Sequence, residues 1–210
     1  MIKTKAPSTT SYGSTALQWI QELNEIRDRV TATNRGGTVL SLEEALTGLM
    51  ERMIAVSTRG NKLIFIGNGG SAAIASHQAL DYWKNGGFEA VAFNDSILLT
   101  CISNDYGYEK VFSEPILHFG KEGDLLVAIS SSGQSPNILK AVDTAYQKGC
   151  GVVTLSGFEA MNPLRSLGET NFYVPSRSYG IVEVTHLTLL HSLLESYIVS
   201  KRPVKDGSPA

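Results

Sequence analysis

Two short segments combine glycine and serine in an arrangement that suits the binding of an anion. The first is Gly67-Asn68-Gly69-Gly70-Ser71, which stands between an apolar run and a helical pattern. Glycine lets the backbone approach a ligand closely, and the first N–H groups of the following helix are free to face an anion. Because the segment matches neither the GxGxxG fingerprint nor a Walker loop, a tight turn with a helix cap is the alternative.

The second segment is the serine-rich stretch Ser130-Ser131-Ser132-Gly133-Gln134-Ser135, which follows another apolar run. Pro136 suits the first position of a helix, so Ser135 is predicted to be the N-cap. Hydroxyl groups, turn amides and a helix N-terminus thus converge without a nearby positive charge. This combination fits a phosphate monoester held by neutral donors and the helix dipole, and an ordinary serine-rich loop is the alternative.

Histidine and carboxylate side chains suggest metal or acid–base chemistry. His77 and Asp81 are spaced i, i+4, so they share a helix face and could hold one ion; a solvent-facing pair is the alternative. The last helical pattern is strongly apolar, so Glu183, His186 and His191 need an explanation there. On a straight helix Glu183 and His191 lie about 12 Å apart along the axis, too far for one ion. Either the first turn is bent, or the two residues serve sites shared between subunits.

Two further features are ambiguous by themselves. Asn104 and Asp105, within CISNDYG (101–107), are predicted to lie in a loop, where they recognise hydroxyl groups or form a turn. Cys101 and Cys150 lie in apolar surroundings and lack CxxC spacing, which favours reduced core thiols over a disulfide.

The elements that must position these residues follow from hydrophobic periodicity. Five short apolar runs, typical of buried parallel strands, cover residues 62–67, 89–93, 124–130, 151–157 and 171–175. Helical patterns cover 14–33, 41–59, 71–84, 96–118, 136–148 and 181–199. The alternation predicts a doubly wound, flavodoxin-like α/β fold, with a five-stranded parallel sheet flanked by helices and two N-terminal helices. Ligands bind such sheets beyond the C-terminal ends of the strands, where both glycine–serine segments lie.

The composition sets broad limits on the class of protein. With 210 residues, the chain is predicted to form one domain over residues 14–200, with flexible ends at 1–13 and 201–210. Its charged fraction of 18% is below the typical value of about 25%, which hints at surface buried between subunits. The net charge of −2 offers no general attraction to nucleic acid or membranes. Without a signal peptide or a long apolar span, a cytoplasmic protein is expected.

Together the GNGGS segment, the Asn104-Asp105 pair, the ISSSGxS segment and the late helical histidine resemble the sugar isomerase (SIS) domain. More narrowly, they resemble the bacterial phosphoheptose isomerases, also called sedoheptulose 7-phosphate isomerases, over about residues 14–200. The resemblance implies a small sugar phosphate as substrate and a homotetramer with active sites at subunit interfaces. It also implies conversion of sedoheptulose 7-phosphate to a D-glycero-heptose 7-phosphate through a cis-enediol.

The resemblance further implies a role for each matching residue. The phosphate-binding positions are Ser71, Ser130, Ser131, Ser132 and Ser135. The other substrate-binding positions are Asn68, Gly69, Gly70, Asn104 and Asp105. The ligands of a divalent metal, expected to be zinc, fall on His77, Asp81, Glu183 and His191. Either Asp81 or Glu183 would move the carbon-bound proton, and His191 the oxygen-bound proton.

Two positions depart from the family pattern, which usually has Glu where this chain has Asp81 and Gln where it has Glu183. Asp is one methylene shorter, and misplacing a base by about that much can cost about 10²-fold in rate. Glu183 would add a negative charge beside the metal. The alternative function is a non-catalytic SIS module that binds a sugar phosphate or a protein partner, like the replication-regulating branch. Retention of both His77 and His191 favours an enzyme.

Overall fold

The computed structural model describes residues 11–202, so the expectation of flexible ends at 1–13 and 201–210 lies almost entirely outside the described residues. One mixed sheet forms the centre, with the strand order β2-β1-β7-β6-β5-β3-β4. Its strands are β1 (Thr31–Asn34), β2 (Val39–Leu40), β3 (Leu63–Gly67), β4 (Ala90–Ala92), β5 (Leu125–Ser130), β6 (Gly151–Ser156) and β7 (Thr170–Tyr173). Strands β3 to β7 are the five predicted from the apolar runs, and they pair in parallel as expected.

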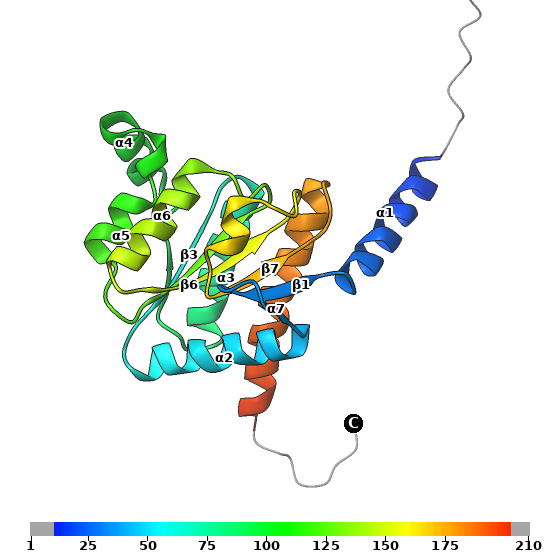
Figure 1. Cartoon of the computed structure of the whole chain (residues 1–210), viewed down its shortest axis with the longest axis horizontal. Coiled ribbons are helices and arrows are strands. Elements are labelled where there is room, and N and C mark those ends of the chain that lie inside the picture. The colour runs from blue at the N-terminus through cyan, green and yellow to red at the C-terminus, as the bar shows by residue number, and fades with distance from the viewer. Residues whose placement is uncertain (1–10, 203–210) are drawn as a thin grey trace, which may run out of the picture.

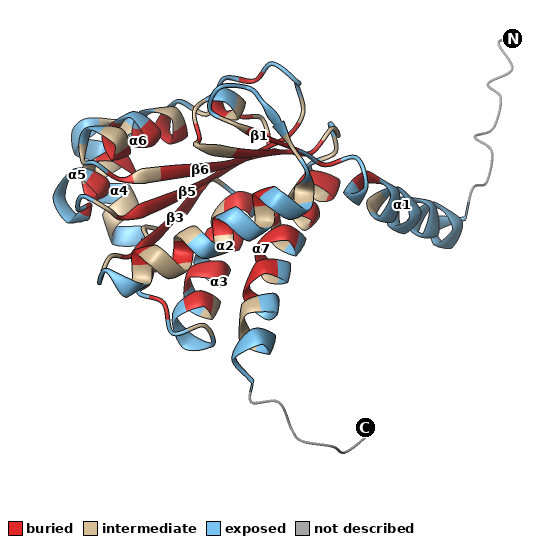
Figure 2. Ribbon diagram, turned by 60° about the horizontal axis from the view of Figure 1, so that its bottom comes forward, coloured by how far each residue is buried: buried red, intermediate tan, exposed pale blue. Residues whose placement is uncertain are grey.

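Helices cover both faces of the sheet (Figure 1). They are α1 (Tyr12–Arg27), α2 (Leu42–Thr58), α3 (Gly70–Lys84), α4 (Ser96–Tyr106), α5 (Ser113–Phe119), α6 (Pro136–Gln147) and α7 (Tyr179–Lys201), with short 3₁₀ turns η1 (Tyr108–Lys110) and η2 (Pro163–Ser166). Successive residues of β3 point into different cores: Leu63 and Phe65 pack with α2, α3 and α7, whereas Ile64 and Ile66 pack with α5 and α6. Burial of the central strands on both faces (Figure 2) explains their uninterrupted apolar sequence.

An antiparallel hairpin extends the sheet beyond the five predicted strands. The sequence predicted helix over 14–33, but α1 ends at Arg27 and Thr31–Asn34 forms β1, which pairs with β2 and with β7. Threonines favour a strand here, and the turn is closed by Thr38 N–H, which donates to Asn34 Oδ1 at 2.9 Å. Gly37 has φ +82°, a conformation that ends any helical pattern.

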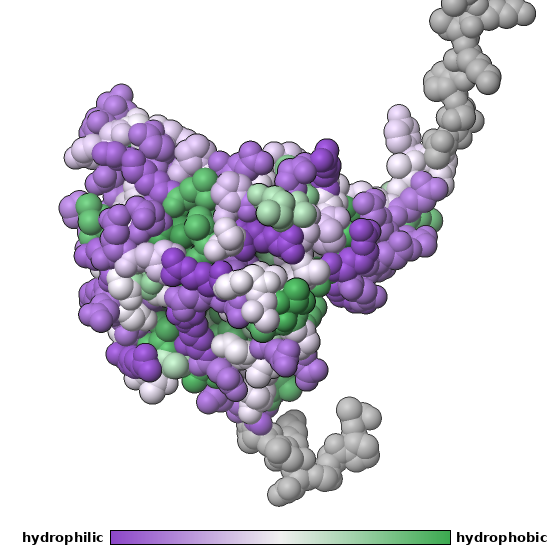
Figure 3. Space-filling model, viewed as in Figure 1, coloured by the Kyte–Doolittle hydropathy of each residue, from purple (hydrophilic) through white to green (hydrophobic). Residues whose placement is uncertain are grey.

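Helix α1 protrudes from the body and is exposed along most of its length (Figures 1 and 2). Ile26 is buried and Leu23 packs partly on the main core, where α1 contacts α7. Leu17 and Ile20 are 69% and 49% exposed. Hydrophobic side chains on the protruding helix therefore lie open among hydrophilic ones (Figure 3).

The two cysteines are both free, but their environments differ. Cys150 is buried as predicted, whereas Cys101 is exposed on α4, so the prediction of a core thiol was wrong for Cys101. No helix in residues 11–202 combines the length and apolarity needed to span a membrane.

Candidate active site

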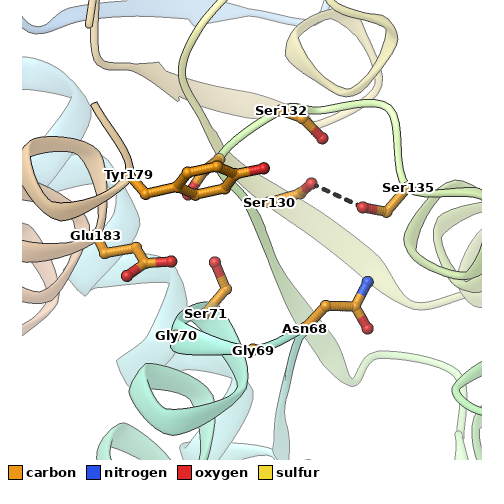
Figure 4. Close-up of a pocket in the computed structure, with 10 residues that line it drawn as sticks. Asn68, Gly69, Gly70, Ser71, Ser130, Ser132, Ser135, Tyr179 and Glu183 are labelled. Carbon is orange, nitrogen blue, oxygen red and sulfur yellow. Dashed lines mark hydrogen bonds between the residues drawn. The ribbon is translucent and has the colours of Figure 1, made fainter. Parts of the chain in front are cut away.

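The two glycine–serine segments meet at the C-terminal ends of two neighbouring strands, β3 and β5. β3 and β5 are adjacent and parallel, so the loops after them lie side by side. Between the loops lies a cavity of about 370 Å³ (Figure 4). Its lining residues are Asn68, Gly69, Gly70, Ser71, Ser130, Ser131, Ser132, Ser135, Tyr179 and Glu183. Every predicted phosphate-binding serine is therefore present at this cavity.

Of the three helices that begin at the cavity, α3 and α6 have no side-chain cap. The N-cap of α3 is Gly69, which has no side chain. The N-cap of α6 is Ser135, whose side chain makes no hydrogen bond to the helix. By contrast α1, α2, α4 and α7 are all capped by serine or aspartate side chains. The N–H groups of Gly70 and Ser71 in α3, and that of Asn137 in α6, thus remain available to a ligand, whereas Pro136 has no N–H and Ile138 N–H donates to Asn137 Oδ1. The φ of +54° at Gly69 explains why glycine stands at this N-cap.

The serine hydroxyl groups leave hydrogen-bonding capacity for a ligand. Ser130 Oγ and Ser135 Oγ lie 3.4 Å apart. Ser131 is buried, and its Oγ has no hydrogen-bond partner within residues 11–202. No lysine, arginine or histidine lines the cavity, so a bound anion would be held by hydroxyl groups and helix dipoles.

Glu183 approaches this cavity from α7 rather than joining the histidines. Its carboxylate lies so close to Gly70 that any side chain at position 70 would collide with it. α7 is continuous from Tyr179 to Lys201, which gives no support to a bent first turn. In the described chain, Glu183 therefore faces the anion cavity, whereas the resemblance had grouped it with the metal ligands.

His77, Asp81 and His191 form a second cluster, named here the histidine–carboxylate group. One ligand atom of each lies within 4.8 Å of the others. Asp81 Oδ2 is 3.3 Å from His77 Nε2 and 3.9 Å from His191 Nδ1, and the two rings meet edge to face at 5.2 Å. Two imidazoles and one carboxylate are a usual ligand set for a divalent ion and leave one position open for substrate. The residues therefore fit a metal site, and His77 keeps half its side chain exposed.

Asn104 and Asp105 lie apart from the cavity. The structure places both in the last turn of α4, so the prediction of a loop was wrong. Asp95 caps the helix and Gly107, with φ +92°, follows its end, so the helical turn extends through both residues. Both are exposed, and Asn104 Nδ2 donates to Asp105 Oδ1 at 2.8 Å.

Tyr179 and His186 complete the environment of the site. Tyr179, at the first turn of α7, lines the cavity, and its sequence context carries no signal of that role. His186 is fully buried, and its Nε2–H donates to the carbonyl of Ser156 at 3.1 Å. Burial lowers the pKa of His186 to about 4, so the ring is neutral near pH 7. His186 therefore serves to link α7 to β6 in the buried interior.

Comparison with known proteins yields one family and several relatives. A family model described as SIS domain matches residues 18–157. The chain is 35% identical to a phosphoheptose isomerase of Shewanella sp. (strain ANA-3), over 74% of this chain and 83% of the relative. For that of Shewanella frigidimarina (strain NCIMB 400) the identity is 34%, over 83% and 93%. Phosphoheptose isomerase GmhA from Neisseria gonorrhoeae superposes with a TM-score of 0.77 at 29% identity, over 90% of this chain and 100% of that chain.

Proposed function

Because this chain belongs to the SIS domain family, we propose that it is an aldose–ketose isomerase acting on sedoheptulose 7-phosphate. The product is a D-glycero-heptose 7-phosphate, formed through a cis-enediol. The Shewanella relatives and the Neisseria gonorrhoeae structure, all named phosphoheptose isomerase, support this assignment.

The observation that carries the proposal is the spacing of the two clusters along α3. The anion cavity lies at Gly70 and Ser71 in its first turn, and the histidine–carboxylate group begins at His77. From Ser71 to His77 the helix rises about 9 Å, at about 1.5 Å per residue. With carbon–carbon bonds of about 1.5 Å, the carbonyl end of an extended seven-carbon chain lies a similar distance from its phosphate. An open-chain heptose phosphate therefore has a suitable length, and we propose that it spans both clusters.

The proposed chemistry moves two protons and leaves the formula unchanged. Asp81 removes a proton from C1 of the ketose and returns it to C2, the former carbonyl carbon. His191 carries the hydroxyl proton from O1 to O2, so the ketose becomes an aldose. Each such acid or base contributes typically about 10²–10⁴-fold. Asp81 suits the carbon-bound proton because it lies with the histidines, whereas Glu183 lines the cavity in which the phosphate is proposed to bind.

A divalent ion, which we take to be zinc, completes the proposed site. His77, Asp81 and His191 would hold it, as their mutual spacing allows. When bound, such an ion polarises a carbonyl oxygen as a Lewis acid. Metal analysis of the purified protein, with a His77→Ala variant for comparison, tests whether this group holds the ion.

We further propose a homotetramer with its active sites at subunit interfaces. The histidine–carboxylate group lies at the surface, with the His77 side chain 50% exposed, so a neighbouring subunit is needed to exclude water. Leu80 and Trp83, on the same helix, are 44% and 53% exposed. Such apolar residues beside a site fit an interface.

Two broader expectations accompany this function. Residues 14–200 are proposed to form a single SIS domain, because strands from both halves of the chain share one sheet. A cytoplasmic location, and the lack of nucleic-acid and membrane partners, stay predictions from the sequence.

An isomerisation assay in D₂O tests the proposal. The purified chain is incubated with sedoheptulose 7-phosphate and the sugars are followed by proton NMR. We expect aldose to form with deuterium at C2, because the base exchanges its proton with solvent. Asp81→Asn and His191→Ala are each expected to lower kcat by about 10²-fold or more. His118→Ala, at an exposed histidine of α5, is the matched control and should keep full activity.

The same experiment separates the enzyme from a non-catalytic SIS module. Calorimetric binding of sedoheptulose 7-phosphate without aldose formation or deuterium exchange would contradict the enzyme assignment and favour the binding module.

A further inference from the structure

We propose that Asn137 and Tyr108 are positioning residues that hold the two loops of the anion cavity at a fixed separation, by locking the side chain of Asn68. The inference rests on the proposed function, since it concerns the same cavity. Neither Asn137 nor Tyr108 lines that cavity, and both act through Asn68, which does.

The contact between the loops is a reciprocal pair of amides. Asn68 Nδ2 donates to Asn137 Oδ1 at 2.9 Å, and Asn137 Nδ2 donates to Asn68 Oδ1 at 2.9 Å. Asn68 lies in the loop after β3, and Asn137 lies in the first turn of α6, directly after the serine-rich loop. The pair therefore bridges the two halves of the cavity wall.

Neighbouring groups fix the direction of both amides. Asn137 Oδ1 also accepts from the backbone N–H of Ile138 at 3.0 Å, so this atom must be the oxygen of Asn137. The nitrogen of Asn137 then faces Asn68, which must present its own oxygen. Asn137 is only 2% exposed, so water cannot easily replace these bonds. The arrangement has one orientation and resists rotation.

Tyr108 adds a third bond to the same atom of Asn68. Its hydroxyl donates to Asn68 Oδ1 at 3.0 Å. With donors from both Asn137 and Tyr108, the two lone pairs of this oxygen are occupied. The amide oxygen of Asn68 thus accepts hydrogen bonds from Asn137 and Tyr108 and has no lone pair left for the substrate. Tyr108 begins η1, just after α4, so the bond also ties the Asn104-Asp105 segment to the cavity.

These hydrogen bonds between the two loops are expected to affect anion binding. A phosphate must receive donors from α3 and from α6 together, and charge-assisted hydrogen bonds depend on distances of about 2.7–2.9 Å. If the amide pair is lost, the N-terminus of α6 is free to shift away from that of α3. Phosphate affinity and KM should then change more than kcat, because the histidine–carboxylate group lies on other turns of α3 and α7.

A double-mutant cycle on phosphate binding tests the inference. Inorganic phosphate is titrated calorimetrically into wild-type protein, Asn68→Ala, Asn137→Ala and the double variant. We expect each single variant to weaken phosphate binding about 10-fold, and the double variant to weaken it no further, since the two side chains act as one unit. Asn94→Ala is the matched control. It deletes an amide that bonds Ala72 and Ser76 of α3 but does not touch α6, so phosphate affinity should stay unchanged.

Tyr108→Phe keeps the test valid even if Asn137→Ala folds poorly, because the Tyr108 side chain is at the surface. We expect it to weaken phosphate binding about 3-fold in the wild-type background and not at all in Asn68→Ala. Effects that multiply across the cycle, or variants that bind as well as wild type, would overturn the inference alone. A wild-type protein that binds neither phosphate nor sedoheptulose 7-phosphate would overturn the proposed function and this inference with it.

Discussion

His186 differs from the other histidine of α7 in being fully enclosed. Its only hydrogen-bond partner in the described chain is the carbonyl of Ser156, and its Nδ1 has none. Protonation would therefore place an unsolvated charge in the core. The burial of His186 therefore makes the stability of the domain depend on pH.

We expect acid to destabilise the fold through His186. Its pKa is lowered from 6.5 to about 4, so between these values the unfolded chain binds a proton that the native chain does not. Stability is therefore fully present above about pH 6.5 and falls as pH decreases toward about 4. The expected loss is on the order of 3 kcal/mol. The measurement is the free energy of unfolding by denaturant at a series of pH values.

Two variants isolate the contribution of this residue. His186→Gln retains an N–H donor for Ser156 but cannot ionise, so its free energy of unfolding should vary less between pH 6.5 and 4. His118→Gln, at an exposed histidine, should behave like wild type. An unchanged pH dependence in His186→Gln would show that other groups control acid stability.

The positions of site residues were predictable where residue type and spacing were sufficient. The serines of both loops and the His77/Asp81 pair lie where their sequence context indicated. Asn137 was missed because a buried amide in a first helical turn looks like any polar capping residue. The place of Glu183 beside Gly70 was missed because it depends on how α7 crosses α3, which no local pattern records.

At the scale of elements, α1 is the helix that packs least against the rest of its own chain. A single helix of 16 residues is marginal in water without tertiary packing. Trp19, Leu23 and Ile26 are oriented toward the body, with Trp19 beside Gly180 of α7, whereas Leu17 and Ile20 stay open. The apolar face is therefore wider than the surface that α7 offers, as expected for a helix that also packs on another subunit.

We expect Leu17→Glu/Ile20→Glu to break the assembly into smaller units, because two charges would be buried in the proposed interface. Light scattering coupled to size-exclusion chromatography measures the mass. Gln18→Glu/Gln21→Glu places the same charges on a polar side of the same helix and should leave the mass unchanged. Equal masses for both double variants and wild type would remove α1 from the interface.

The elements themselves were mostly predictable, because the parallel strands are buried on both faces and their apolar runs are unambiguous. The hairpin was not, because β1 and β2 are short and only half buried. Their stability comes from pairing with β7, which is remote in sequence. The signals present in the sequence were the threonines of β1 and the Gly36-Gly37 pair that follows it, and both are also compatible with a helix end.

At the scale of the whole molecule, the sheet joins two modes of pairing. Strands β3 to β7 form a parallel core, and the two glycine–serine loops lie at the C-terminal ends of its neighbouring strands β3 and β5. The hairpin occupies the edge beyond β7, away from the two glycine–serine loops. The site is therefore framed by the part of the sheet that the sequence predicted, and the unpredicted part extends the opposite flank.

The antiparallel pairing of β1 with β7 has a consequence for the order in which the strands fold during synthesis. Thr31 must pair with Tyr173, and at a synthesis rate of roughly 5–20 residues per second its partner emerges on the order of ten seconds later. A two-stranded hairpin is marginal alone, so it waits on the nascent chain for nearly the whole domain to be translated. Pulse-labelled hydrogen exchange should show β1 amides becoming protected together with β7 and no earlier than β3 and β5. Protection of β1 before β7 would mean that the hairpin folds without β7. In that case β7 would pair with a β1 strand that had already formed on the nascent chain.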